Sequence, residues 1–138
     1  MIFPPIFELS LVGVADPNVA NLERLVIRPT QEINLGQFGV LIGYRRQDSS
    51  IVPIWDQFYW FGEVVISPPS WIVLYTGKGD YNVATQSNGE KVYNFYWNKV
   101  TTVFQADSYV PVLIRLGGVA IGPLLQPPRK AVAAQTPR

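Results

Sequence analysis

A double proline followed by an unbroken run of β-forming residues places the strongest constraint on the fold of this chain. Pro68 and Pro69 end one strand, because proline donates no hydrogen bond to a sheet, and residues 70–75 (Ser-Trp-Ile-Val-Leu-Tyr) begin another. Positions 71–75 are apolar or aromatic on both faces of that strand. Both faces therefore need a cover, which can be a second sheet, a loop or another chain. The segment predicts packed β layers.

An alternation of apolar and polar residues recurs along most of the chain, and no window of about eleven residues shows a helical stripe. Turn-forming residues separate the alternating stretches; Asn88-Gly89, for example, tolerates the positive φ of a tight hairpin. We predict an all-β fold, an immunoglobulin-like two-sheet antiparallel β-sandwich of about seven to nine strands. The expected strands include residues 7–11, 22–28, 33–46, 51–66, 71–75, 81–86, 91–98, 100–104, 110–116 and 119–121.

The expected strand at residues 33–46 has an apolar face and a face interrupted by glycine. Phe38, Val40, Ile42 and Tyr44 lie on one side, whereas Gly39 and Gly43 lie on the other. Glycine inside a strand often marks a bulge or a close approach by a neighbouring group. Gly39 and Gly43 therefore indicate either a bulge or a close approach by a neighbour, and both readings stay open.

The domain organisation follows from where this pattern stops. The hydrophobic content of 48% is enough for one core in a chain of 138 residues, so we predict one β-sandwich domain over residues 1–122. From residue 123 the alternation is lost, and Pro127-Pro128-Arg129-Lys130 is followed by an Ala/Gln/Thr/Pro end. Residues 123–138 are predicted to form a flexible Pro-rich, basic tail.

The chain contains no cysteine and no histidine, which removes several chemistries at once. Disulfides, thiolate metal sites, catalytic cysteine, the Ser-His-Asp triad and histidine acid–base catalysis are all excluded. The acidic residues are scattered and form no calcium-binding loop, so no metal and no cofactor are expected. Asp56 and Glu63, flanked by Trp55 and Trp60, are the one acidic pair beside aromatic residues, and solvated loop charges explain them more simply. We predict no catalytic residues and no enzymatic activity.

Charge and terminal sequence bound the partners and the location. The net charge of +1 argues against a nucleic-acid binder, and Arg24 and Arg28 are explained most simply as solvated charges on a sheet face. The first five residues, Met-Ile-Phe-Pro-Pro, lack the basic region of a signal peptide. No apolar run approaches the roughly 20 residues that span a bilayer. We expect no membrane insertion and a cytoplasmic or particle-associated location.

Two stretches of the chain resemble the lamin-tail domain, an immunoglobulin-like sandwich. That family has a strand that begins with Glu and leads to a Leu-Ser-Gly-Trp-x-Leu step. Here residues 23–27 (Glu-Arg-Leu-Val-Ile) are followed by residues 34–40 (Asn-Leu-Gly-Gln-Phe-Gly-Val). The family also has a Pro-Pro-Gly or similar turn into an apolar strand, and residues 68–75 (Pro-Pro-Ser-Trp-Ile-Val-Leu-Tyr) match that pattern.

The resemblance covers residues 7–121 with three departures from the family pattern. Phe38 stands where the family has Trp, and Gln37 and Ser70 stand where it has Gly. The resemblance implies an interaction module without catalytic activity, since the family's known partners are nucleic acid, chromatin proteins and surface structures. None of the family's binding residues can be transferred to positions in this chain.

Aromatic residues concentrate between residues 55 and 61. In a strand, Phe58 and Trp60 face one way and Tyr59 and Phe61 the other, so one pair can fill the core while the other pair needs a cover. Core and loop packing, a partner interface and a small-ligand platform all remain open. The candidate partner-binding residues are Trp55, Phe58, Tyr59, Trp60, Phe61 and Trp71.

The function predicted from these features is a non-enzymatic structural or protein-interaction module with an aromatic-rich surface. Its partner is a protein or a second copy of itself, in a homo-oligomer. The alternative is a carbohydrate-binding module that stacks sugars on exposed Trp55, Tyr59 or Trp60.

Overall fold

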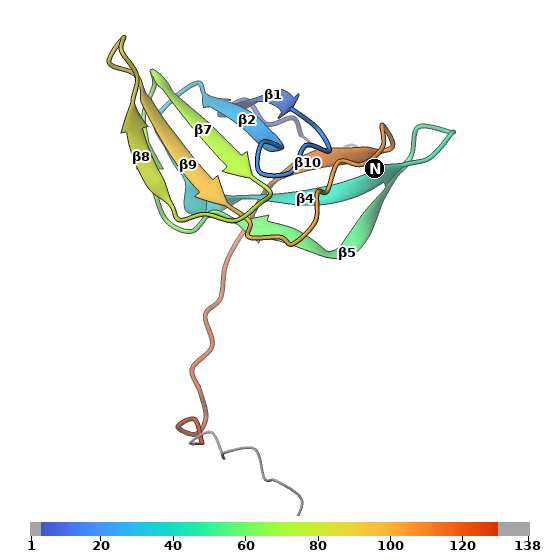
Figure 1. Ribbon diagram of the computed structural model, residues 1–138. Helices are drawn as coiled ribbons and strands as arrows, with labels where there is room; N and C mark the ends of the chain where they lie inside the picture. Colours follow the sequence, from blue (N-terminus) through green and yellow to red (C-terminus); the bar gives the residue numbers. More distant parts are fainter. Residues whose placement is uncertain (1–3, 130–138) are drawn as a thin grey trace, which may run out of the picture.

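The protein is built from two stacked β-sheets and contains almost no helix (Figure 1). The structure is a computed structural model that describes residues 4–129, except for the side chain of Trp55. The five-stranded sheet has the order β1-β2-β7-β9-β8, and the three-stranded sheet has the order β10-β4-β5. A third sheet of two short strands pairs β3 with β6. The predicted all-β sandwich is confirmed.

The strand bounds agree with most of the expected segments, but a 3-10 turn at residues 35–37 divides the expected strand 33–46, and residues 61–64 divide the expected strand 51–66. The five-stranded sheet contains β1 (Leu9–Ala15), β2 (Arg24–Pro29), β7 (Ser70–Tyr75), β8 (Asn82–Thr85) and β9 (Lys91–Tyr96). The three-stranded sheet contains β4 (Phe38–Arg45), β5 (Ile51–Trp60) and β10 (Tyr109–Arg115). The short elements are β3 (Ile33–Asn34), η1 (Leu35–Gln37) and β6 (Val65–Ile66). Of these ten strands, two contain only two residues, and the other eight match the predicted number.

One pair of strands departs from the expected antiparallel arrangement. The hairpin of β8 and β9 forms as predicted, with Gly89 at a φ of 88° in its turn. However, β9 rather than β8 lies beside β7, and the two run parallel from Ser70 opposite Lys91 to Tyr75 opposite Tyr96. The hairpin therefore joins the sheet through β9, its second strand. The residues of the turn predict the hairpin, but they do not predict which of its strands pairs with β7.

The core lies between the inner faces of the two larger sheets. Leu25 of β2 pairs with Leu74 of β7, and Phe38 and Val40 of β4 are fully buried in the same cluster. Burial alternates residue by residue along β2, as the sequence pattern predicts. The other core members are Leu9, Ile27, Ile33, Leu35, Phe61, Ile66, Ile72 and Phe95.

Two expected strands at the margins of the sheets are wrong, because residues 100–104 and 119–121 form no strand. The expected strand 7–11 begins only at Leu9, and Phe7 before it is exposed. Leu11 of β1 is also partly exposed, because β1 is an edge strand whose register shifts between Leu11 and Gly13. Alternation in the sequence predicts which face of a strand a residue lies on. It does not predict whether that strand pairs with a neighbour or whether another element buries that face.

A buried carboxylate replaces the missing strand at residues 100–104. Glu23 lies directly before β2 and accepts hydrogen bonds from the backbone N–H groups of Val103 and Phe104 at 2.7 and 2.9 Å. It also accepts from the Asn18 N–H and the Thr76 hydroxyl, each at 2.7 Å. These four bonds satisfy the buried carboxylate and tie the loop that precedes β10 to the five-stranded sheet.

The described chain continues past the last strand. The N–H of Leu116 donates to the carbonyl of Gln37 at 2.7 Å, and residues 117–129 are exposed and have no secondary structure. They run away from the body on the side of the three-stranded sheet (Figure 1). The predicted boundary at residue 122 stays a prediction, and residues 130–138 of the expected tail lie outside the described residues.

Candidate interaction surface

The aromatic run of β5 is divided between the core and the surface. Tyr59 and Phe61 point inward, with ring centroids 5.3 Å apart, and Phe61 lies 5.1 Å from Phe95. Tyr59 also packs against Trp97 at 5.6 Å. Burial raises the pKa of the Tyr59 hydroxyl above its ordinary value. These two candidate residues therefore join the two sheets from within, which corresponds to the core-packing alternative.

The outer face of the three-stranded sheet carries the other half of the run. Strand register places Phe58 opposite Leu41 and Trp60 opposite Gly39, and β10 continues both rows on the far side of β4. Phe58, Trp60 and Ile51 are each 46% exposed. We call this surface the apolar face; its members are Leu41, Ile51, Pro53, Phe58, Trp60, Val110, Val112 and Ile114.

Two glycines of β4 allow the apolar face to pack flat. A Cβ atom at Gly39 would lie 2.5 Å from the Phe58 ring, and a Cβ atom at Gly43 would overlap Ile51. The side chains of β5 therefore lie across the backbone of β4. This confirms the close approach that glycine at these positions predicted, and it leaves the sheet with a broad apolar surface.

A bulge in β5 is the reason that all four outward residues of this strand share one side. Pro53 pairs with Gly43 and Phe58 pairs with Leu41, so residues 54–57 stand against Ile42 alone. Within the bulge, Asp56 has a φ of 64°. Because the insertion changes the parity of the strand, odd-numbered residues before it and even-numbered residues after it face outward. Trp55 lies in the bulge, and its side chain is outside the described ones.

The outer face of the five-stranded sheet is also aromatic, but its tryptophan, Trp71, has charged partners. The Arg28 guanidinium lies 4.0 Å from the centroid of the Trp71 ring. Glu90 accepts hydrogen bonds from Trp71 Nε1 at 2.9 Å and from Arg28 Nη2 at 3.2 Å. The candidate residue Trp71 is thus covered by its own sheet. Arg28 is therefore paired with Glu90 and is not simply a solvated charge on the sheet face. Arg24 is paired as well, with Asp16 at 2.7 Å.

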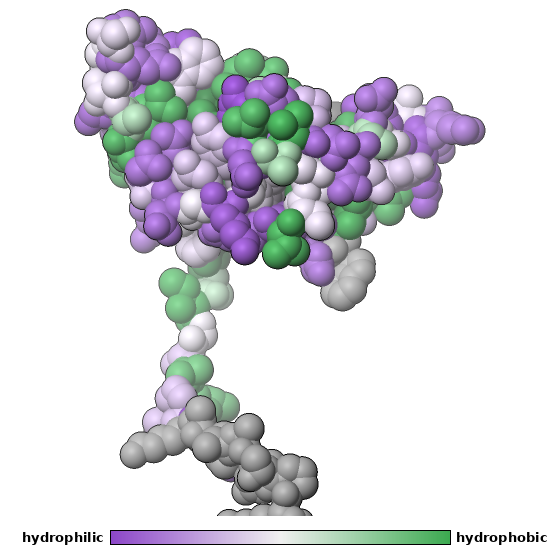
Figure 2. Space-filling model, in the orientation of Figure 1, coloured by the Kyte–Doolittle hydropathy of each residue, from purple (hydrophilic) through white to green (hydrophobic). Residues whose placement is uncertain are grey.

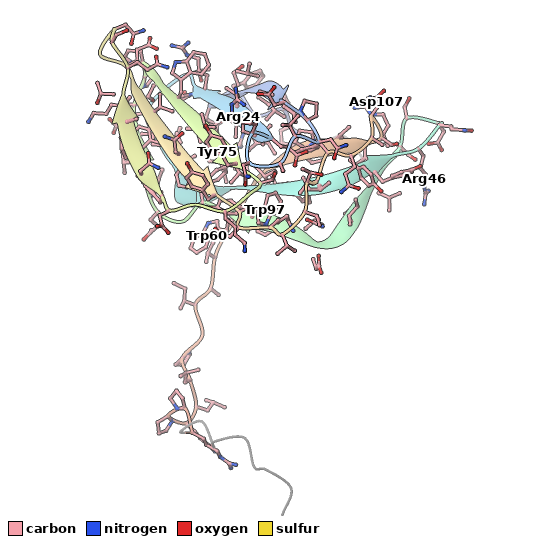
Figure 3. The ribbon with its side chains drawn as sticks, in the orientation of Figure 1. Arg24, Arg46, Trp60, Tyr75, Trp97 and Asp107 are labelled. Atoms are coloured by element: carbon pink, nitrogen blue, oxygen red, sulfur yellow. The ribbon has the colours of Figure 1, made fainter. Side chains whose placement is uncertain are left out.

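A stacked tyrosine pair completes that second surface. Tyr75 and Tyr96 lie directly opposite each other on β7 and β9, with ring centroids 5.0 Å apart and planes at 10°. Gly79 lies against the Tyr96 ring, where a side chain would collide with it. Figure 3 shows Tyr75 on the five-stranded sheet, near Arg24 and on a different layer from Trp60.

The two ends of the apolar face differ in how many charged residues they carry. At the end formed by the β4–β5 turn, a shallow hollow is lined by Arg45, Arg46, Asp48 and Asp107. There Ser50 donates its hydroxyl and its N–H to Asp48, and these bonds lower the pKa of that carboxyl. At the opposite end Trp60 lies where the C-terminal part of the chain leaves the body (Figure 3). Such mixed charge at one end suits a polar rim.

The acidic residues flanking the aromatic run lie at the surface, and the described part of the chain has no cluster of metal ligands. Asp56 and Glu63 are both exposed, the first in the bulge of β5 and the second after that strand has ended. No group of three or more His, Cys, Asp or Glu residues in the described part could hold a metal ion. In the same part of the chain, no helix is long and apolar enough to cross a membrane.

Comparison with known proteins adds no relative to this description. No family model matches the chain, no curated protein matches it, and no solved structure resembles it at a significant level.

Proposed function

We propose that this protein is a non-enzymatic structural module that associates with itself through the apolar face. The observation that carries the proposal is the half-exposed state of Phe58, Trp60 and Ile51 of β5. They belong to a three-stranded sheet whose outward paired positions, outside the β5 bulge, are all apolar apart from glycine and the terminal Arg45. Contiguous apolar patches of this kind seldom persist on a protein without a partner.

The composition of the apolar face supports a protein partner. Phe58 and Trp60 are large aromatic side chains, the type that anchors interfaces, and aliphatic residues of β10 and Leu41 surround them. Their surroundings are short of charge along the strands, whereas Arg45 and Arg46 lie at one end. An apolar centre beside a charged margin is the usual arrangement at a protein interface.

The resemblance to the lamin-tail domain forms part of the same proposal. Glu23 directly precedes β2, and the Pro68-Pro69 turn leads into β7, as the resemblance leads one to expect. The four hydrogen bonds to Glu23 supply a structural reason for a glutamate at the start of that strand. Both observations support an interaction module of that kind.

A carbohydrate-binding function is the second candidate, and the surroundings of Trp60 favour it. A shallow hollow beside Trp60 also exposes polar groups of Asn34, Gln37 and Glu63. The Trp60 Nε1 group donates to the Gly36 carbonyl at 2.9 Å, which holds the indole ring in place. A fixed ring beside amide and carboxylate groups could stack a sugar and bind its hydroxyls. Quenching or a shift of tryptophan fluorescence with soluble polysaccharides would test this candidate, with Trp60→Leu as the control.

Measurement of molar mass in solution tests the first proposal. Size-exclusion chromatography with light scattering, over a range of concentrations, should show an assembly larger than one chain. Phe58→Ser should shift the protein to the monomer, because it places a polar group at the centre of the apolar face. Val83→Ser is the matched control, since Val83 is 47% exposed on the edge strand β8 of the other sheet. A strict monomer at every concentration would overturn self-association.

A further inference from the structure

The described chain carries a second unpartnered apolar surface, the C-terminal segment of residues 117–129. Every residue of this segment is exposed, and Leu125 reaches 95%. Its other large apolar side chains are Val119, Ile121 and Leu124. Figure 2 shows these hydrophobic groups strung along a segment that stands clear of the body. Four exposed aliphatic side chains in so short a stretch need a cover as much as the apolar face does.

The segment begins at the border of the apolar face. Leu116 is held by its hydrogen bond to Gln37, and the shallow hollow beside Trp60 is lined by Gly117, Val119 and Ile121 as well. Gly117 and Gly118 have open space where a side chain would lie. The backbone can therefore change direction freely at this point, just after β10 has ended.

The length of the segment suits a docking role. Its residues span at most about 45 Å when extended, at roughly 3.3–3.6 Å per residue. Three strands about 4.8 Å apart give a sheet only about 15 Å wide. Pro123, Pro127 and Pro128 disfavour a helix and suit an extended chain. The segment is thus long enough to cross a whole three-stranded sheet and still extend beyond it.

We propose that the C-terminal segment of one copy lies across the apolar face of a second copy. This inference rests on the proposed self-association and names the group that covers the face. The segment leaves the body on the side of the three-stranded sheet and points away from its own strands (Figure 1). It therefore presents its aliphatic residues to a molecule that faces that sheet. If each copy places its segment on the apolar face of the other, both segments and both faces are buried in a closed two-fold dimer.

Matched substitutions separate the segment from the face. Ile121→Asp combined with Leu124→Asp should convert the assembly to a monomer, as Phe58→Ser does, because charges on the segment cannot be buried against the apolar face. The control is Val100→Asp, since Val100 is 87% exposed on a loop far along the chain from the segment. The control variant should keep the mass of the unmodified chain.

Mixing the two defective variants is the decisive experiment. The Phe58→Ser chain keeps an intact segment, and the Ile121→Asp/Leu124→Asp chain keeps an intact face. An equimolar mixture should recover part of the dimer mass that neither variant shows alone, since one of the two contacts can form. If the segment variant assembles like the unmodified chain while Phe58→Ser does not, the segment proposal is overturned and self-association stands. Failure of the mixture to recover any dimer also overturns the segment proposal.

Cysteine cross-linking decides which copy provides the segment, because the chain has no cysteine of its own. A chain with Leu124→Cys and a chain with Val112→Cys, mixed and oxidised, should form a mixed disulfide dimer in higher yield than either homodimer. When both cysteines are placed in one chain, the cross-link should again join two chains. An internal disulfide in a monomer would show that the segment folds onto its own face. A monomeric unmodified chain would overturn both proposals together.

Discussion

The outer faces of the two sheets carry similar numbers of aromatic residues, yet they differ in how those residues are satisfied. On the five-stranded sheet, Trp71 lies under Arg28 and donates to Glu90, and Tyr75 stacks on Tyr96. On the three-stranded sheet, Phe58 and Trp60 lie among aliphatic residues and glycine, and no charged side chain pairs with their rings among the described contacts. The Trp60 Nε1 group donates to the Gly36 carbonyl, but its ring stays half exposed. One surface finds its partners within the chain, and the other is left half exposed.

This difference teaches that aromatic content is a poor guide to an interface when it is taken alone. A ring with a cation on its face and a carboxylate at its edge is already paired, and removing it from that arrangement costs free energy. A ring without such groups gains only by losing contact with water. We therefore expect substitutions on the first surface to weaken folding and substitutions on the second to weaken assembly.

The largest effect is expected at Glu23, which ties the loop before β10 to the five-stranded sheet. Glu23→Ala would leave the buried N–H groups of Val103 and Phe104 without their acceptor. We expect a loss of about 3 kcal/mol or more in the free energy of unfolding, measured by urea denaturation.

The control for that measurement is another glutamate that bonds a hydroxyl at the surface. Glu32→Ala removes an exposed hydrogen bond from Ser67 and should change stability by about 0.5 kcal/mol or less. Equal losses for the two variants would contradict a special role for the buried carboxylate. An unchanged urea midpoint after loss of Glu23 would likewise show that this carboxylate does not stabilise the junction between the loop before β10 and the five-stranded sheet.

One substitution on each aromatic surface gives the next largest effect and tests directly whether the two surfaces serve folding and assembly separately. Trp71→Ala should destabilise the monomer by about 2 kcal/mol, through lost burial and the lost contact with Arg28, and should leave the molar mass unchanged. Phe58→Ser should change monomer stability by about 1 kcal/mol or less and should abolish assembly. Denaturation and light scattering on both variants decide the matter, and the reverse assignment of effects would break the comparison.

The cation above Trp71 should contribute a smaller share. Arg28→Ala leaves Glu90 with the indole N–H as its partner and removes the charge from the ring, at a cost of about 1 kcal/mol. Because the pair with Glu90 is partly exposed, the cost should fall at high salt. Arg28→Lys provides the control that keeps the charge, and a loss that is independent of salt would argue against an electrostatic cause.

The smallest effect belongs to the core that both surfaces share, and it appears only at alkaline pH. Burial raises the pKa of Tyr59 above its ordinary value of about 10, so the folded state holds this proton more tightly than the unfolded state does. Its contribution to stability is complete below pH of about 10 and is lost as the pH rises through the folded pKa. Tyr59→Phe should flatten this alkaline loss. Titration of tyrosinate absorbance, with and without Tyr59, checks it.

Much of the fold could be predicted because local pattern decides it. Phe38 and Val40 alternate with glycine, so they turn to the core wherever the strand is placed. The opposite directions of Phe58 and Tyr59 follow from strand geometry, and the structure confirms them. The hairpin at Asn88-Gly89 depends only on residues in its own turn.

The remainder was beyond prediction because it depends on contacts between distant residues. The pair of Arg28 with Glu90 closes between residues 62 positions apart, and Glu23 reaches Phe104 across 81 positions. Residues 100–104 are β-branched or aromatic, as is typical of a strand, but the N–H groups of Val103 and Phe104 bind the Glu23 carboxylate. A pattern in sequence records the side on which a residue lies and does not record which group comes to cover it.

The sequence by itself therefore determined that this chain forms a β-sandwich, which residues alternate into its core, and that its aromatic residues exceed what one core can hold. The tertiary structure alone decided where the excess appears. The bulge at residues 54–57 reverses the parity of β5 and brings Ile51 and Phe58 to the same side, and the neighbours of Trp71 cover the other sheet. The physical reason is that alternation follows from a backbone repeat of two residues, whereas cover and pairing depend on which strands become neighbours.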